Sequence, residues 1–321
     1  MSSPPDSLPT SPYFNLEQLA EGVWAAIVAR GTGAWGNAGI VALGERMLVF
    51  DTFLTPAAAR DLRSAAEALT GQQVAYVVNS HYHMDHIHGN AVFDDATIIT
   101  TGKTRERIAN RGAEILAWMR EKPDDLASLD AEIVSAATPE LADDLRVAQG
   151  DYRALYAALP ELALRLPDIT FEQRLTLHGS ERAVNVLSYG GGHTSSDAFL
   201  FLPAERIAFL GDLLGVRMHP SFGQADLERW DEILERIEAL DIQTVVPGHG
   251  SVGTLDDVAA LRQYLGDMEM LVDEAIVRGE TAERIVALPP PGAYAAWGAR
   301  DIYTDNLRHL YSLLARSAEE E

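Results

Sequence analysis

The chain has 321 residues, of which 47% are hydrophobic, and 48 acidic against 25 basic side chains give it a formal net charge of −23. A chain of this size and composition buries a full core, which excludes a disordered or fibrous protein. The absence of cysteine excludes disulfide scaffolds, thiol nucleophiles and thiolate metal sites. The negative charge argues against nucleic acid or an anionic membrane surface as a partner.

The N-terminal residues 1–12 have neither a basic start nor an apolar stretch. We therefore expect a disordered tail and not a secretion signal, and hence a cytoplasmic protein. No run of 18 apolar residues occurs, so no membrane span is expected. Residues 13–316 contain no short-period repeat and no low-complexity linker. We therefore expect residues 13–321 to form one domain with a helical insertion; the alternative is that the insertion folds separately.

The first half of the chain begins with short runs rich in branched residues, which predict strands at 22–29, 39–44 and 47–51. Thr55 and Pro56 provide an N-cap and a first-turn proline for a helix over 57–69, which Gly71 ends. The apolar run 74–79 predicts a strand buried on both faces. Residues 104–167 then change to Ala, Leu and charged residues at helical spacing, a predicted helical insertion with breaks near Pro123, Pro139 and Pro160.

The second half again contains short runs rich in branched residues, which predict strands at 169–177, 183–188, 198–202, 207–210 and 244–247. Helices are expected at 227–240 and, in the C-terminal segment 255–316, at 255–278 and 302–314. Two strand-rich halves, each followed by helices, predict an α/β fold in which two sheets pack together with helices outside, a four-layer αββα sandwich.

The strongest signal for chemistry follows the strand 74–79 directly. Four of the nine histidines lie within positions 81–88, as His81, His83, His86 and His88, with Asp85 among them. Imidazole with carboxylate is the usual ligand set for zinc where cysteine is absent. Three further candidate ligands are weaker signals taken singly. Each follows a glycine at a later predicted strand end, and they are His193, Asp212 and His249.

The sequence resembles the metallo-β-lactamase superfamily, over about residues 15–105 and 175–252. The family's HxHxDH motif matches His81, His83, Asp85 and His86, and its later His, Asp and His match His193, Asp212 and His249. The resemblance implies that His81, His83 and His193 hold one metal ion, that Asp85, His86 and His249 hold a second, and that Asp212 bridges them. Two zinc ions are expected, with iron or manganese as alternatives. Asp85 and Asp212 are the predicted catalytic residues.

The resemblance implies hydrolysis of a small-molecule substrate by a hydroxide that bridges the two metals. With a bridging aspartate at position 212, the chain resembles the thioesterases, lactonases and RNase Z-like nucleases of the superfamily and differs from its true β-lactamases. The negative net charge argues against a nuclease. The predicted substrate is therefore a carboxylic ester, thioester or lactone. Two alternatives stay open: a β-lactamase-like amide hydrolase, and an oxidoreductase like the mononuclear iron persulfide dioxygenases.

Several residues near these motifs have undecided roles. Asp51 ends a strand, where it either orients a ligating imidazole or forms a turn. His88 is expected to be structural or to support a ligand. Side chains that either line a pocket or pack in the core are Trp35, Tyr82, His219 and Phe222. The insertion 104–167 is expected to cover the metal site, with an oligomer contact as the alternative; the sequence leaves the oligomeric state open.

Overall fold

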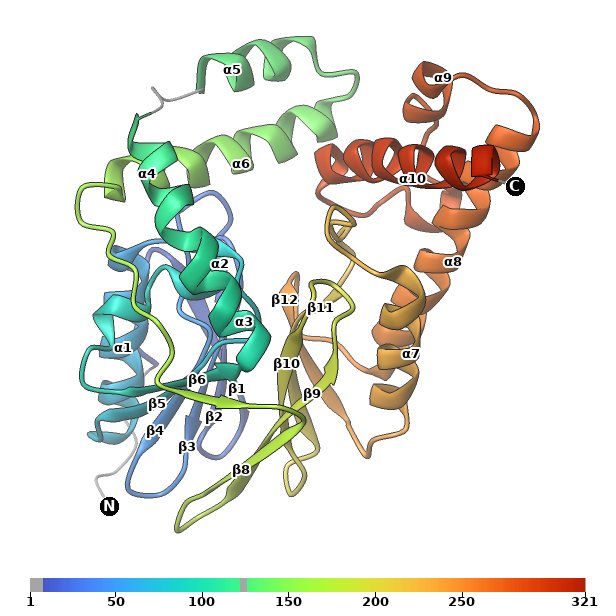
Figure 1. Cartoon of the computed structure of the whole chain (residues 1–321). Helices are drawn as coiled ribbons and strands as arrows, with labels where there is room; N and C mark the ends of the chain where they lie inside the picture. The colour runs from blue at the N-terminus through green and yellow to red at the C-terminus, as the bar shows by residue number, and fades with distance from the viewer. Residues whose placement is uncertain (1–7, 122–125, 321) are drawn as a thin grey trace.

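The computed structural model describes residues 8–121 and 126–320. Its strands form two sheets that face each other (Figure 1). The first sheet contains, in spatial order, β1 (Phe14–Ala20), β2 (Val23–Val28), β3 (Ala38–Ala42), β4 (Met47–Phe50), β5 (Val74–Val78), β6 (Thr97–Thr101) and β7 (Ile169–Phe171). The second contains, in spatial order, β12 (Thr244–His249), β11 (Ile207–Gly215), β10 (Asp197–Leu202), β9 (Ala183–Gly190) and β8 (Arg174–His178).

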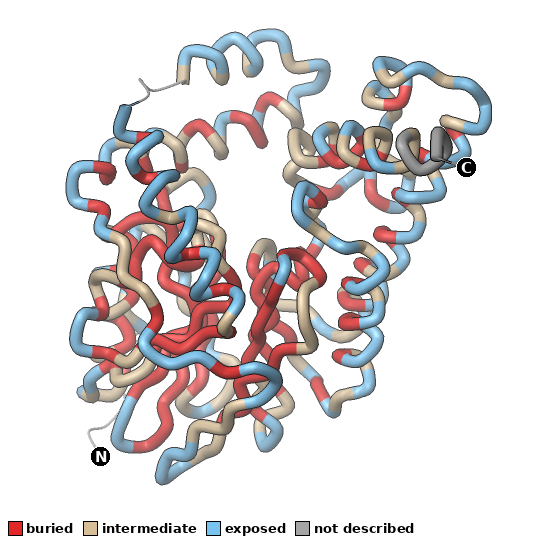
Figure 2. The backbone as a smooth tube through the Cα atoms, viewed as in Figure 1, coloured by how far each residue is buried: buried red, intermediate tan, exposed pale blue. Residues whose placement is uncertain are grey.

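The two sheets pack against each other through apolar side chains from both, among them Phe50, Leu200 and Phe209, which are buried. Helix α1 (Pro56–Thr70) covers the outer face of the first sheet, and α7 (Leu227–Glu238) and α8 (Leu255–Val277) cover the second. The buried residues of Figure 2 accordingly lie mainly along the strands. The predicted four-layer αββα sandwich is confirmed.

Local sequence sets the ends of these helices. Thr55 accepts a hydrogen bond from the amide of Ala58, Pro56 is the first residue of α1, and Gly71 ends the helix with a φ of 73°. Thr254 and Asp257 form a reciprocal capping box at the start of α8. The start of α1 is thus the one expected from Thr55 and Pro56.

The insertion is helical over most of its predicted length. It contains α3 (Gly102–Arg107), a π-helical turn η2 (Ile108–Gly112), α4 (Ala113–Glu121), α5 (Leu126–Ser135) and α6 (Pro139–Ala158). Pro139 begins α6 and Pro160 follows its end, whereas the break expected near Pro123 lies outside the described residues. Residues 159–168 run without regular structure to β7, so the helical segment ends earlier than 167.

Several strand predictions differ from the structure. The single strand expected at 169–177 is two strands, because β7 joins the first sheet and β8 joins the second. Strands β1 and β6 were not predicted; β6 is a short Thr-rich run that ends where the insertion begins. Strand β11 continues to Gly215, five residues beyond the expected end, because it pairs with β12 as far as His249.

The remaining described elements are two short helices, α2 (Met84–Ile87) and α9 (Ala282–Val286), the 3-10 turns η1 (Asn90–Val92) and η3 (Gly292–Tyr294), and the C-terminal helix α10 (Arg300–Glu320). Within the described residues, no helix has both the length and the apolar character that crossing a membrane requires. The cytoplasmic location stays a prediction.

The expected N-terminal tail is only partly described. Residues 1–7 lie outside the described residues. Residues 8–12 have no regular structure, but the hydroxyl of Ser11 donates to Asp61 of α1 over 2.9 Å. The segment after residue 7 is therefore held against α1 and differs from the free tail that we expected.

Candidate metal centre

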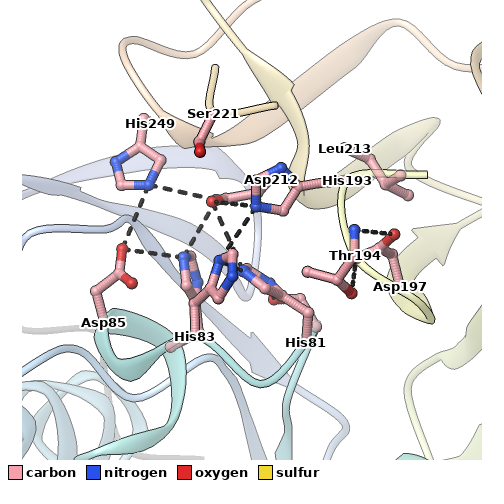
Figure 3. Close-up of polar contacts among 12 residues, drawn as sticks. His81, His83, Asp85, His193, Thr194, Asp197, Asp212, Leu213, Ser221 and His249 are labelled. Carbon is pink, nitrogen blue, oxygen red and sulfur yellow. Dashed lines mark hydrogen bonds and ion pairs between the residues drawn. The ribbon is translucent and has the colours of Figure 1, made fainter. Parts of the chain in front are cut away.

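The seven candidate ligands meet at one end of the two sheets, although they come from distant parts of the chain (Figure 3). Four follow strand β5, in the loop and short helix α2. The other three come from the β9–β10 loop, from β11 and from the end of β12. Strand ends supply the ligands because the backbone turns there and leaves the side chains facing the junction of the sheets.

The first group contains His81, His83, His193 and Asp212, whose ligand atoms all lie within 4.8 Å of one another. The Nδ1 atom of His83 lies 2.9 Å from Nε2 of His81 and 3.2 Å from Nε2 of His193. Oδ2 of Asp212 lies 3.3 Å from Nε2 of His193. Three imidazole nitrogens and one carboxylate oxygen therefore converge on a single point.

The second group contains Asp85, His86 and His249. Oδ2 of Asp85 lies 3.2 Å from Nε2 of His86 and 3.3 Å from Nε2 of His249. Oδ1 of Asp212 lies 3.1 Å from the same nitrogen of His86 and 3.4 Å from that of His249. The two oxygens of Asp212 thus face different groups, which is the geometry that a bridging carboxylate needs.

This donor set fits metal cations. The buried Nε2 of His86 and Oδ1 of Asp212 have no hydrogen-bond partner among the described residues, and buried polar atoms are normally paired. Nitrogen and oxygen ligands without sulfur suit zinc, and also iron and manganese. Nε2 of His86 and Oδ1 of Asp212 both face the second group, where a cation would satisfy them.

Burial keeps two histidines of the first group neutral. It lowers the pKa of His81 well below the ordinary value, and it lowers that of His83 to about 4, with the neighbouring His193 adding to the effect. A neutral imidazole offers a lone pair to a metal. These side chains are therefore in the protonation state that ligation requires.

In the second group the carboxylates of Asp85 and Asp212 form ion pairs with protonated histidines. Burial opposes the charged form of His249, but Asp212 and Asp85 raise its pKa to about 10. Despite burial, the histidines hold the pKa values of both carboxyl groups well below the ordinary range. The carboxylates are ionised and attract positive charge, which a metal ion would supply in place of the imidazolium protons.

Asp51 supports the ligands and is not a simple turn residue. It is fully buried, and its Oδ2 lies 2.8 Å from Nδ1 of His86. It also accepts from the amide and the hydroxyl of Ser80, both over 2.7 Å, and that hydroxyl lies 2.9 Å from Nδ1 of His81. Asp51 therefore orients one imidazole directly and a second through Ser80.

Asp197 holds the loop that carries His193 in place by hydrogen bonds. Its carboxylate accepts from the amides of Gly192 and Thr194, over 2.9 and 3.0 Å, and from the Thr194 hydroxyl over 2.7 Å. The indole of Trp230 lies edge-on to the His193 ring at 5.3 Å. Neither Ser80 nor Asp197 was assigned a role from the sequence, although each stands within four residues of a ligand.

A cavity of about 270 Å³ lies over the two groups. Trp35 and His219, whose roles the sequence left open between pocket lining and packing, line this cavity. Phe222 does not, because it is fully buried between Trp230 and Tyr264 and belongs to the core. Of the described residues, no lysine or arginine lines this cavity.

Tyr82 and His88 lie on the other side of the ligand loop. They line a separate small cavity with Arg107 and Arg111, and the Arg107 guanidinium lies 5.4 Å from the centre of the Tyr82 ring. His88 is buried and belongs to neither ligand group. Both side chains therefore surround the ligand loop and do not face the reaction site.

The comparisons with known proteins agree with this fold. Residues 32–249, more than half of the chain, match the family model of the metallo-beta-lactamase superfamily. The metallo-beta-lactamase type 2 of Bacteroides fragilis is 30% identical over 110 residues, which span 33% of this chain and 44% of that protein. The match thus spans less than half the length of that relative.

Solved structures also resemble the chain. A metallo-beta-lactamase from Pontibacter korlensis superposes with a TM-score of 0.59 at 18% identity, over 79% of this chain and 99% of that one. A metallo-beta-lactamase from Hirschia baltica gives 0.56 at 16% identity, over 79% and 97%. At such identities the likeness concerns the fold alone.

The αββα sandwich carries paired His/Asp groups at the junction of its sheets, an arrangement that suits metal cations. With the family model matched from residue 32 to His249, the chain belongs to the metallo-β-lactamase superfamily.

Proposed function

We propose that this protein is a dinuclear metal-dependent hydrolase that cleaves a carboxylic ester, thioester or lactone. The observation that carries the proposal is the position of Asp212, whose two oxygens face the two ligand groups. Two cations held this way, which we take to be zinc, would polarise a carbonyl and lower the pKa of bound water towards neutrality.

The chain's own residues would position the reactants. Asp85 presents a carboxylate oxygen at the centre of the second group, where it can hold an attacking water by a hydrogen bond. Leu214, Met218 and Ile302 line the cavity above and favour an uncharged carbonyl compound over a charged one. The volume of this cavity supports a small-molecule substrate and not a polymer.

A β-lactam is the second candidate substrate, because the relative from Bacteroides fragilis and the two solved structures are named as metallo-beta-lactamases. The bridging position of Asp212 is the reason to prefer esters. A single metal-loaded preparation should therefore be assayed on a thioester, a lactone, a β-lactam and a phosphodiester. Ester or lactone turnover well above β-lactam turnover supports the proposal, and the reverse order assigns the protein to amide hydrolysis.

Metal content separates hydrolysis from the iron oxidoreductase alternative. We expect close to two ions per chain, because seven ligands are too many for one tetrahedral or five-coordinate ion. Elemental analysis of fully loaded protein should give two ions. A single iron, retained by protein purified without added metal, would contradict the dinuclear proposal.

A further inference from the structure

A second cavity of about 290 Å³ adjoins the metal centre, and we call it the side pocket. It shares five lining residues with the cavity over the metal ligands: Trp35, Met218, His249, Ala299 and Ile302. A group bound in the side pocket therefore lies next to a carbonyl placed over the ligands. The side pocket holds about ten water volumes, at roughly 30 Å³ each.

Distant parts of the chain build this pocket. The end of β2, helix α6 of the insertion and the start of α10 contribute most of the lining, and Trp35, Met218 and residues 249–251 complete it. Residues 299–302 lie outside the segment 32–249 that matches the superfamily model. The side pocket thus depends partly on chain that the family model does not describe.

Close contacts fix α6 against the loop that follows β2. A side chain at Gly150 would approach the carbonyl oxygen of Gly31 to 2.4 Å, so the two backbones touch. Asp151 accepts from the amide of Gly33 over 2.7 Å, and Tyr152 packs edge-on to Trp35 at 5.0 Å. The wall that α6 forms is therefore firmly positioned beside the loop that carries Trp35.

Asp144 of α6 ties the pocket to α10. This buried carboxylate pairs with Arg30 at 2.8 Å and with the Arg300 guanidinium at 3.1 Å, and it accepts from the Arg300 amide over 3.2 Å. The Arg30 guanidinium thus already has a partner within the protein. It is not free to bind an anionic substrate without giving up that pair.

The chemistry of the lining is apolar with spare negative charge. The apolar part comes from Ile27, Val28, Val147, Ala148, Met218 and Ile302. Asp151 and Asp301 also line the pocket, and neither has an ion-pair partner in the parts of the chain that the structure describes. Such a lining accepts an uncharged hydrocarbon group and repels an anionic one.

We propose that the side pocket binds the uncharged, apolar chain of the ester or lactone substrate and so selects medium-length acyl groups. The inference rests on the proposed hydrolytic function for the position of the carbonyl. A methylene group and a water molecule are of similar size, so an unbranched chain of about six to eight carbons fits the volume. An anionic group at the far end of the acyl chain would be disfavoured.

The test uses p-nitrophenyl esters with acyl chains of two to ten carbons on the metal-loaded full chain. We expect kcat/KM to rise about threefold per methylene up to about eight carbons, somewhat below the full transfer value for a buried CH₂. At pH 8, where Asp151 is ionised although burial raises its pKa to about 6, an eight-carbon ester that ends in a carboxylate should be at least about tenfold slower than its uncharged counterpart. Equal rates for the two would overturn the predicted selection against charge.

Ala148→Phe places a ring in the pocket, and Ala157→Phe makes the same change at an exposed position of α6. The first variant should lower the ratio of kcat/KM for the eight-carbon over the two-carbon ester by at least about tenfold. The second should keep the wild-type ratio. Ala148→Leu should give an intermediate ratio and replaces the larger variant should that fail to fold.

A binding measurement separates this proposal from the hydrolytic one. 2-Nonanone has a carbonyl and an apolar chain but cannot be hydrolysed, and calorimetry should show that it binds wild type at least about tenfold tighter than Ala148→Phe. Binding without turnover of any ester would retain the side pocket and reject the hydrolase. Turnover of the two-carbon ester without chain-length dependence or ketone binding would reject the side pocket and retain the hydrolase.

Discussion

Glycines allow the ligand groups to approach one another at the strand ends. Gly248 precedes His249, and a Cβ atom at this position would lie 1.9 Å from Oδ1 of Asp212. It would also lie 2.7 Å from the carbonyl carbon of Gly211 and 2.8 Å from the amide nitrogen of Asp212. Real Cβ atoms do not come so close, so any side chain here displaces Asp212, backbone and carboxylate together. The smallest side chain therefore tests the bridge without removing a ligand.

We predict that Gly248→Ala lowers both metal content and turnover. Displaced Asp212 no longer bridges the groups, so bound metal should fall below two ions per chain and kcat/KM by about a hundredfold. Elemental analysis and ester kinetics measure the two effects. Gly266→Ala is the matched control, because no atom lies within 4 Å of the added Cβ and alanine favours the interior of α8. Normal metal content and turnover in Gly248→Ala would contradict the bridge.

Asp51 contacts a candidate metal ligand, His86, and is not itself a ligand. It binds the Nδ1 side of His86, and it is held with a φ of 60°, which few residues other than glycine adopt. Such a conformation is retained where surrounding contacts determine it. The three hydrogen bonds from Ser80 and His86 supply those contacts.

We predict that Asp51→Asn weakens metal binding by about ten- to a hundredfold, the usual cost of losing a partner of a ligating histidine. Asparagine presents an NH₂ group where His86 and Ser80 both require an acceptor. Competition with a chromogenic chelator measures the affinity. Asp61→Asn, on α1 and away from both ligand groups, should bind metal like wild type, and an unchanged affinity in Asp51→Asn would leave Asp51 a structural role only.

Helix α6 is the element that connects the insertion with the rest of the site. Its Asp151 is buried, lines the side pocket and accepts from the amide of Gly33. Burial raises the pKa of Asp151 from the ordinary 3.8 to about 6. The folded protein therefore binds this proton more tightly than the unfolded chain does.

The raised pKa gives Asp151 a defined pH dependence. Protonation of Asp151 stabilises the fold at low pH, and this contribution is lost as the pH rises through about 6. Asp151→Asn keeps an oxygen for the Gly33 amide and removes the charge, so its melting temperature should rise relative to wild type between pH 5 and pH 8. Asp143→Asn, exposed on the same helix, should show no such trend. A difference between Asp151→Asn and wild type that does not change with pH would refute the prediction.

Elements with a clear local pattern were predictable, and elements that depend on distant partners were not. The ligand loop was recognisable because His81, His83, Asp85 and His86 stand together after an apolar strand. The division of 169–177 into β7 and β8 could not be predicted from the sequence, because it depends on which sheet each short strand joins. Phe222 resembled a pocket residue in sequence, and only the contacts with Trp230 and Tyr264 place it in the core. The side pocket likewise exists only where α6 and α10 meet.

At the scale of the whole molecule, the net charge of −23 opposes anionic substrates. Four basic residues lie at the start of the insertion, where they would form a local anion site if they faced the metal ligands. Three are engaged elsewhere: Arg105 donates to the carbonyl of Pro167 over 2.9 Å, Arg107 contacts the Tyr82 ring, and Arg111 lies 3.6 Å from Glu114. The fourth, Lys103, lines a different cavity between β6 and β8.

We predict that a thioester or lactone is turned over far better than bis-p-nitrophenyl phosphate at the same metal loading. Phosphodiester enzymes need cationic groups to offset substrate charge, and the cavity over the ligands has none among the described residues. Comparison of kcat/KM for the two substrates tests this. A phosphodiester preference of about tenfold, roughly 1.4 kcal/mol in transition-state binding, would move the protein to phosphodiester chemistry.

The ligands of each metal group come from both sheets, and this has a consequence for how the protein matures in the cell. His86 and His249 belong to the same group, yet 163 residues separate them in the chain. At a synthesis rate of about 5–20 residues per second, roughly 10–30 s pass between the emergence of the two side chains from the ribosome. A nascent chain in that interval offers the second group only two of its three ligands. Stable loading of the second group with metal is therefore expected only after His249 has emerged and β12 has joined its sheet.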